Sequence, residues 1–307
     1  MYVSHKSELE RTSEPQTCAW CEATLGTDAT PLRGRVRCRS CGVANTHPWP
    51  TDAELSEAYS GWYRPASGRF SGVGDALLRH TRGRLARRLD RIAPPGPVLD
   101  VGAGDGALLD ALATHGRDAL GLEREATRPD VLAAELTDID GEWAAIVFWH
   151  SLEHLRHPGQ AIDRAVALLK PRGVLVIAVP NADSLQAEVF GDSWLALDLP
   201  RHLVHLPART VVDRARQGSL RVERLSYWRG GQVVFGWLHG LVGALPSHPD
   251  LYDAIRRPEA QRSRQSGRSR VLTLAAGIML LPVAAAAAVI EILIGRGGTI
   301  YVEARRA

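Results

Sequence analysis

The sequence predicts an α/β domain, because short apolar runs alternate with helix-forming stretches. Val98–Val101 is a strand-like run that leads through a glycine-rich turn into the helix-forming stretch Ala107–Thr114. Trp143–Trp149 and Val174–Val179 are apolar runs of the length of buried parallel strands. The chain has 307 residues, which is enough for one full α/β domain with accessory segments.

The turn after the first strand carries glycines at alternate positions, Gly102, Gly104 and Gly106, and continues directly into a helix. Glycine lets the backbone reverse sharply and approach a ligand closely. Backbone N–H groups and the positive end of the helix converge at such a turn, which predicts a site for a nucleotide-like ligand. The spacing Gly102-x-Gly104-x-x-Ala107 also satisfies the loose dinucleotide pattern, which alone is a weak signal.

Three acidic residues help to choose between nucleotide-like ligands. Asp100 precedes the first glycine, Asp105 lies in the turn, and Glu123 ends the next predicted strand. A carboxylate about 20 residues after the glycines is placed to bind ribose hydroxyls. Acids in the turn would repel a pyrophosphate but suit a ligand with a cationic sulfonium and an amino group.

The motif D-V-G-A-G-D-G at Asp100–Gly106, together with Leu169–Gly173, resembles the class I S-adenosylmethionine-dependent methyltransferases. The resemblance implies a Rossmann-like seven-stranded sheet whose last strand is antiparallel, with S-adenosylmethionine as the methyl donor. Asp138 and Asp140 precede the Trp143–Trp149 strand, and one of them is expected to contact the adenine amino group. The predicted donor-binding residues are Asp100, Gly102, Ala103, Gly104, Gly106, Glu123, Asp138 and His150.

Four cysteines in two Cys-x-x-Cys pairs predict an N-terminal zinc ribbon at residues 1–47. They are Cys18, Cys21, Cys38 and Cys41. The pairs are separated by sixteen residues, and four thiolates fill a tetrahedral zinc site, so the zinc is expected to be structural rather than catalytic. Disulfides are the alternative, but Met1–Glu14 has no apolar signal core that would direct secretion.

Residues 48–95 are predicted to form a helical linker. Thr51 and Glu54 have the spacing of a capping box, which predicts a helix through Tyr59. Asp75–Ile92 has apolar residues at helical spacing with arginines between them, and a solvated arginine face is favoured over contact with nucleic acid. An aromatic group in the linker either folds over the cofactor as a lid or packs against the core. It comprises Tyr59, Trp62 and Tyr63.

His150–His154, with the sequence H-S-L-E-H, follows a predicted strand at the sheet edge where open α/β sheets bind their ligands. This segment matches the H-x-x-E-H pattern of the inverzincin metalloproteases, in which both histidines project from one helix to a metal ion. Here the segment lies at a strand-to-helix junction, which argues against that interpretation. Leu152–Pro158 instead resembles the segment after the fourth strand of the ubiquinone-biosynthesis O-methyltransferases. A metal held by Glu153 and His154 is kept as an alternative.

His202 and His205 are the preferred general-base candidates, because a neutral imidazole can accept a hydroxyl proton near neutral pH. His150 and His154 are less favoured candidates for the same role. The alternative is that His202 or His205 only orders its loop. The Leu199–Leu206 segment and the stretch from Pro50 to Tyr59 resemble a bacterial subgroup of small-molecule methyltransferases with a zinc ribbon fused ahead of the domain, a resemblance that covers most of residues 18–230.

The methyltransferase core is expected to span 96–230 and to be completed by a final strand at 296–307. Residues 231–295 form an apolar insertion between them, and its segment Val271–Ile290 has twenty uncharged residues, enough to match a hydrocarbon core. A single span would place the final strand on the wrong side of the membrane. We therefore expect a helix or helical pair at the cytoplasmic interface, with the arginines of Arg256–Arg270 on anionic head groups. A buried helix or a dimer contact is the alternative.

The sequence therefore predicts an S-adenosylmethionine-dependent methyltransferase, and the resemblance implies that it acts on a hydroxyl of a small-molecule, sugar or lipid-linked acceptor. The expected location is the cytoplasm, at the inner face of the cell membrane. A net charge of +3 and dispersed arginines argue against a nucleic-acid partner, although an RNA methyltransferase that holds RNA with its zinc ribbon is kept as an alternative. The other alternative is a non-catalytic, membrane-tethered zinc-ribbon scaffold.

Overall fold

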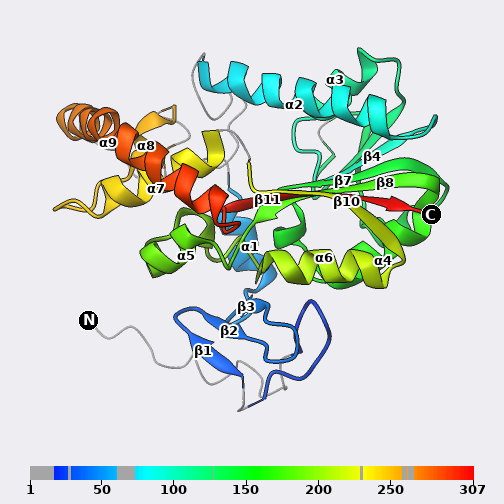
Figure 1. The fold of residues 1–307 in the computed structure, drawn as a ribbon, viewed down its shortest axis with the longest axis horizontal. Coiled ribbons are helices and arrows are strands. Elements are labelled where there is room, and N and C mark those ends of the chain that lie inside the picture. The colour runs from blue at the N-terminus through cyan, green and yellow to red at the C-terminus, as the bar shows by residue number, and fades with distance from the viewer. Residues whose placement is uncertain are drawn as a thin grey trace.

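The fold is centred on a seven-stranded sheet with strand order β10-β11-β8-β7-β4-β5-β6 (Figure 1). The computed structural model describes residues 17–26, 29–60, 73–126, 128–228, 231–257, 261 and 266–307. The strands of this sheet are β4 (Val98–Val101), β5 (Ala119–Glu123), β6 (Val131–Ala133), β7 (Trp143–Trp149), β8 (Leu169–Pro180), β10 (Leu220–Ser226) and β11 (Thr299–Arg306).

The sheet confirms the predicted topology. β4 is parallel to β5 and β7, and β7 is parallel to β8, so their carboxyl ends share one edge. β11 lies between β8 and β10 and is antiparallel to both. Every residue of β7 is buried, because helices cover both faces of the sheet and an apolar strand loses water on each side.

Helices flank the sheet in two layers, with α2 and α3 over one face and α4 and α6 over the other in Figure 1. Their bounds are α2 (Val73–Ile92), α3 (Ala107–Ala113), α4 (Pro158–Leu168) and α6 (Ala208–Gln217). The linker helix α1 (Asp52–Ala58) has the predicted capping box between Thr51 and Glu54. Trp62 and Tyr63, two members of the expected aromatic group, lie outside the described residues.

The cysteine-containing segment forms a second, four-stranded sheet with order β1-β2-β3-β9. Its strands are β1 (Thr30–Leu32), β2 (Arg35–Arg37), β3 (Ala44–Thr46) and β9 (Val204–His205). β9 comes from the segment that precedes α6, and the Thr46 hydroxyl donates a hydrogen bond of 2.6 Å to the His202 carbonyl. The small N-terminal fold is therefore joined to the loop that precedes β9.

The insertion contains α7 (Gly231–Gly243), α8 (Leu251–Ile255) and the long helix α9 (Gly267–Leu293), and the short helix α5 (Leu185–Phe190) packs beside α7. Among described helices, α9 alone is long and apolar enough to cross a membrane, and only 22% of its most apolar window is buried. Both ends of α9 are attached to the protein: Arg270 donates to the Ala254 carbonyl, and the Glu291 carboxylate accepts from the Gln186 N–H. The helix therefore lies along the surface of the protein.

The expectation that the arginines of the insertion face lipid head groups is wrong for two of them. Arg256 is 1% exposed, and its guanidinium lies over the Tyr252 ring. Arg257 forms an ion pair with Asp75 of α2. Both side chains face the protein, since α8 packs against α7 and α9. Arg262 and Arg264 lie outside the described residues.

Candidate active site

A large cavity opens at the carboxyl edge of the parallel strands. The turn Gly102–Asp105 forms one end of the cavity, and His150–Glu153 follows it along the edge. α7 and α8 supply a further wall, which includes Gln232, Phe235 and Tyr252. The insertion near the C-terminus therefore encloses the same cavity as the glycine-rich turn.

The turn after β4 has a backbone that requires glycine. Gly102, Gly104 and Gly106 have φ values of +84°, +64° and +77°, a region that other residues rarely adopt. A Cβ atom on Gly102 would lie 2.3 Å from the Cβ atom of Ser151. Close packing of β4 against the segment after β7 thus depends on the missing side chain.

Glu123 projects from the end of β5 into the cavity beside this turn. Its Oε2 accepts a hydrogen bond of 2.8 Å from the Gly104 N–H, and its Oε1 accepts one of 3.1 Å from the Arg124 N–H. Asp138 also lines the cavity, and its carboxylate accepts from the Glu135 N–H. A glycine turn that lines the cavity, followed by a held carboxylate, fits an adenosine-bearing ligand.

Asp100 lies beneath the turn rather than on the cavity wall. The residue is 4% exposed, and its Oδ1 accepts no hydrogen bond from the described residues. Burial raises the pKa of this carboxyl to about 7, with Arg82 acting in the opposite direction. The acid that precedes the first glycine is therefore poorly solvated.

His150 occupies a strained position at the end of β7. Its φ is +54°, and its N–H donates to the Ala178 carbonyl at 2.7 Å, which holds the backbone in this conformation. The imidazole Nδ1 lies 3.5 Å from Glu153 Oε1, and Nε2 lies 3.1 Å from Gln232 Nε2. His150 therefore connects the sheet edge with the insertion.

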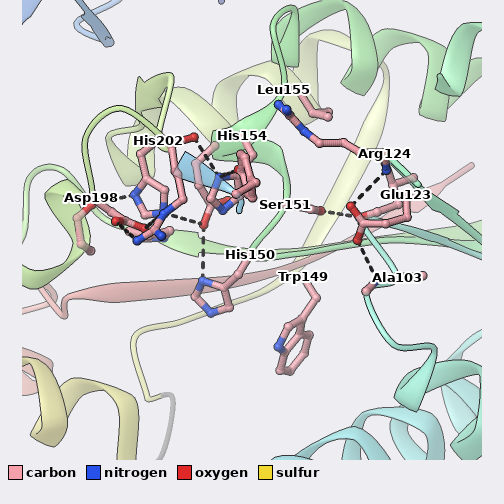
Figure 2. A pocket seen from close by; sticks show the side chains of 18 of the residues that line it. Ala103, Glu123, Arg124, Trp149, His150, Ser151, His154, Leu155, Asp198 and His202 are labelled. Atoms are coloured by element: carbon pink, nitrogen blue, oxygen red, sulfur yellow. Dashed lines mark hydrogen bonds and ion pairs between the residues drawn. The ribbon is translucent and has the colours of Figure 1, made fainter. Parts of the chain in front are cut away.

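His154 and His202 meet on the far side of Glu153, with their ring centroids 4.7 Å apart. Figure 2 shows His154, His202 and Asp198 grouped on one side of His150, with Ala103 and Glu123 on the other. Burial alone would raise the pKa of Glu153, but the neighbouring histidines lower it to about 2. Burial, and then the charge of His202, lower the pKa of His154 to about 4.

The structure brings His150, His154 and His202 to the cavity, but His205 is not among the residues that line it. His205 is 3% exposed and pairs in β9 with Ala44 of the small sheet. Burial lowers its pKa well below the usual range. These observations favour the alternative that His205 orders its loop. Asp198 and Gln232 were missed by sequence reasoning, because neither lies in a motif and both come from segments far from His150.

The four cysteine thiols form one cluster with all Sγ atoms within 4.8 Å of one another. The Sγ atoms of Cys18 and Cys41 are 3.6 Å apart, and those of Cys21 and Cys38 are 3.7 Å apart. These separations exclude disulfides and match the ~3.8 Å that a tetrahedral site with Zn–S bonds of ~2.3 Å requires. Asn45 Nδ2 donates to the Cys18 thiol, which supports the cluster from outside.

Comparison with known proteins finds similarity to methyltransferases. A family model described as a methyltransferase domain matches residues 77–223. The ubiquinone biosynthesis O-methyltransferase of Azorhizobium caulinodans is 27% identical over 152 residues, which are 43% of this chain and 59% of that protein. The chain thus spans about three fifths of the length of this curated relative.

Solved structures with similar folds are distant in sequence. A SAM dependent methyltransferase from Archaeoglobus fulgidus is 16% identical, with 74% of this chain and 94% of that chain covered and a TM-score of 0.44. A cyclopropane synthase from Mycobacterium tuberculosis is 18% identical, with 74% and 82% covered and a TM-score of 0.42.

Proposed function

Residues 77–223 form a methyltransferase domain of the class I S-adenosylmethionine-dependent type, and from this premise we propose that the protein methylates a hydroxyl of a small-molecule acceptor. The observation that carries the proposal is the position of His150. It lies beside the donor turn, because Ser151 packs against Gly102, and its Nδ1 faces the buried Glu153 carboxylate. His150, a proton acceptor with Glu153 as its ionic partner, therefore lies next to the donor site.

The chain supplies distinct groups for the donor. S-adenosylmethionine contributes an electrophilic methyl group, which its sulfonium releases as the acceptor oxygen attacks. The glycine-rich turn Gly102–Gly106 lets the donor approach the backbone closely, the Glu123 carboxylate binds the ribose hydroxyls, and Asp138 receives the adenine amino group. Holding donor and acceptor together lowers the entropic part of the barrier.

His150 takes the hydroxyl proton of the acceptor in this proposal. Its Nδ1 faces the Glu153 carboxylate at 3.5 Å, and its Nε2, which lies 3.1 Å from Gln232 Nε2, receives the proton. The Glu153 carboxylate then stabilises the imidazolium that forms, as a buried acid does for histidine bases generally. This assignment prefers His150 over His202 and His205, because Ser151, the next residue after His150, packs against Gly102 of the donor turn.

The insertion suggests where the acceptor comes from. α7 lines the cavity with Gln232 and Phe235, and on its other side it packs along α9. Outward residues of α9 are apolar and exposed, including Ile278 at 75% and Met279 at 79%. We propose a lipid-linked acceptor taken from the inner surface of the cell membrane, with α9 in the interface. The four cysteines are proposed to bind a structural zinc ion.

Donor binding is the first test. Calorimetric titration of the zinc-loaded protein with S-adenosylmethionine should show binding that Gly104→Arg abolishes. Gly116→Arg is the matched control, since Gly116 also has a positive φ, of +68°, but has open space around its Cβ position. Absence of donor binding by the folded wild-type protein would reject methyl transfer and leave a non-catalytic scaffold.

An acceptor is first sought by following the transfer of a labelled methyl group to candidate alcohols and lipid-linked sugars. The role of His150 as the base is then tested with that acceptor. His150→Ala should lower kcat by about 10²- to 10⁴-fold, the usual contribution of a general base. His115→Ala, an exposed histidine after α3, is the control. Unchanged turnover in the His150 variant would remove its assigned role.

A further inference from the structure

The buried cluster next to His150 has the composition of a metal site. Glu153, His154 and His202 each offer one ligand atom, and these atoms all lie within 4.8 Å of one another. Glu153 and His154 belong to the 3-10 turn Leu152–His154, whereas His202 comes from the loop before β9. The cluster is thus assembled by tertiary structure from two segments that both reach the cavity.

The Glu153 carboxylate lacks the partners that a buried anion needs. The residue is 2% exposed, and neither carboxylate oxygen accepts a hydrogen bond from the part of the chain that the structure describes. Its nearest ionic contacts are longer than hydrogen bonds, at 3.5 Å to His150 Nδ1 and 4.0 Å to His202 Nε2. A buried carboxylate without donors is costly, and a bound cation removes that cost.

His154 and His202 are each held so that one ring nitrogen is available to bind a metal ion. His154 Nδ1 lies 2.9 Å from the Arg201 carbonyl and 2.8 Å from the Tyr59 hydroxyl, and His202 Nδ1 lies 2.8 Å from the Ala196 carbonyl. A carbonyl can only accept, so each Nδ1 carries the proton and each Nε2 keeps its lone pair. Imidazoles fixed in this way by a backbone carbonyl are the usual arrangement around a metal ion.

We propose that Glu153, His154 and His202 bind a divalent first-row metal ion such as Zn²⁺ or Mn²⁺. Two imidazoles and one carboxylate suit these ions, and three protein ligands leave a coordination position open. The Asp198 carboxylate, 3.7 Å from His202 Nε2, adds negative charge beside the cluster. This site is separate from the four-cysteine site, where the four thiolates would complete the coordination of a zinc ion.

Glu153, His154 and His202 line the cavity that also contains the donor turn, so a metal ion held by them would be within reach of an oxygen atom of the acceptor. A hydroxyl on a metal ion loses its proton more readily, which would assist transfer of that proton to His150. This consequence for the acceptor rests on the proposed function, whereas occupancy of the metal site does not.

Metal content tests the proposal without reference to activity. The full-length protein is equilibrated with Zn²⁺, desalted and subjected to elemental analysis. The wild type should retain about two zinc ions per chain, and Glu153→Gln and His202→Ala should each retain about one. His115→Ala should keep two. Thermal unfolding and donor titration identify any variant that fails to fold.

A cobalt spectrum provides the second measurement. Co²⁺ on nitrogen and oxygen ligands lacks the thiolate charge-transfer absorption of a four-cysteine site, so Cys38→Ser should lose that absorption and keep the visible bands of the second ion. One zinc ion in the wild type, or equal metal content in the wild type and both folded site variants, overturns the metal site. Donor binding and methyl transfer that persist in that case leave the proposed function intact.

Discussion

β7 and α9 are both uncharged over most of their length in the sequence, yet they differ in how far their apolar side chains are buried. All residues of β7 are buried between two layers of helices. α9 instead buries a stripe of small or polar side chains and exposes its large apolar ones. The buried stripe is Thr273, Gly277, Ala284, Ala288 and Glu291. An apolar run therefore predicts that its side chains are removed from water, but it does not show whether they are buried within the protein itself.

The two regions also differ in the hydrogen-bond partners that they give to a buried carboxylate. Asp100, in the strand beside β7, has one oxygen without a partner among the described residues. Glu291 of α9 accepts from the Gln186 N–H, from Gln186 Nε2 and from Trp237 Nε1, each at 2.8 Å. The helix is thus fastened to the protein by polar contacts, and its apolar surface is left for another partner.

The largest expected effect comes from the core strand. Phe148 is fully buried in β7, so Phe148→Ala should lower the free energy of unfolding by about 3–5 kcal/mol through lost contacts and a cavity. Met279→Ala in α9 should change it by no more than about 0.5 kcal/mol in the absence of lipid. Urea unfolding of both variants measures the difference. Equal losses would mean that α9 is covered within the folded monomer.

Glu291→Ala should cost about 2–3 kcal/mol, because it leaves the buried Trp237 and Gln186 donors without their acceptor. The matched control is Glu188→Ala, whose side chain is 65% exposed and pairs with Arg296 on the surface. That change should cost less than about 1 kcal/mol. Similar values for the two glutamates, again by urea unfolding, would contradict the fastening role of Glu291.

The exposed face of α9 is tested with vesicles of anionic phospholipid. The double substitution Ile278→Asp and Met279→Asp should reduce vesicle affinity at least about tenfold, because it removes two exposed apolar side chains from the interface. Co-sedimentation measures the affinity, and sedimentation velocity without lipid measures self-association. A wild-type dimer that the substitutions dissociate, with no vesicle binding by either protein, would assign the face to a second copy.

A further prediction concerns the pH dependence of stability. Burial raises the pKa of Asp100 to about 7 from its ordinary value near 3.8, so the folded protein holds this proton more tightly than the unfolded chain. The resulting stabilisation is complete below pH 3.8 and is lost as the pH rises through about 7. Asp100→Asn should therefore flatten the fall of Tm between about pH 4 and about pH 7.

The exposed Asp118→Asn is the control for this pH dependence, because its carboxyl is solvated at the start of β5. It should leave the slope of Tm against pH as in the wild type. An Asp100 variant with the wild-type slope would show that other groups produce the dependence.

Local patterns predicted much of the fold. Trp143–Trp149 coincides with β7, and the capping box of Thr51 and Glu54 starts α1. The antiparallel final strand was expected from the family resemblance rather than from a local pattern. The tight turn at Gly102–Gly106 was predictable from its glycines, which adopt a positive φ readily. The four cysteines meet because their spacing allows it.

Only the tertiary structure decided how distant side chains combine. His202 and His205 are three residues apart, yet one lines the cavity and the other pairs with the small N-terminal sheet, because β9 joins that sheet. The grouping of Glu153 with His202, and of His150 with Gln232, depends on the packing of segments that share no local pattern. Hydrophobic periodicity and turn chemistry act over a few residues, whereas a site requires the convergence of elements whose contacts are settled by packing.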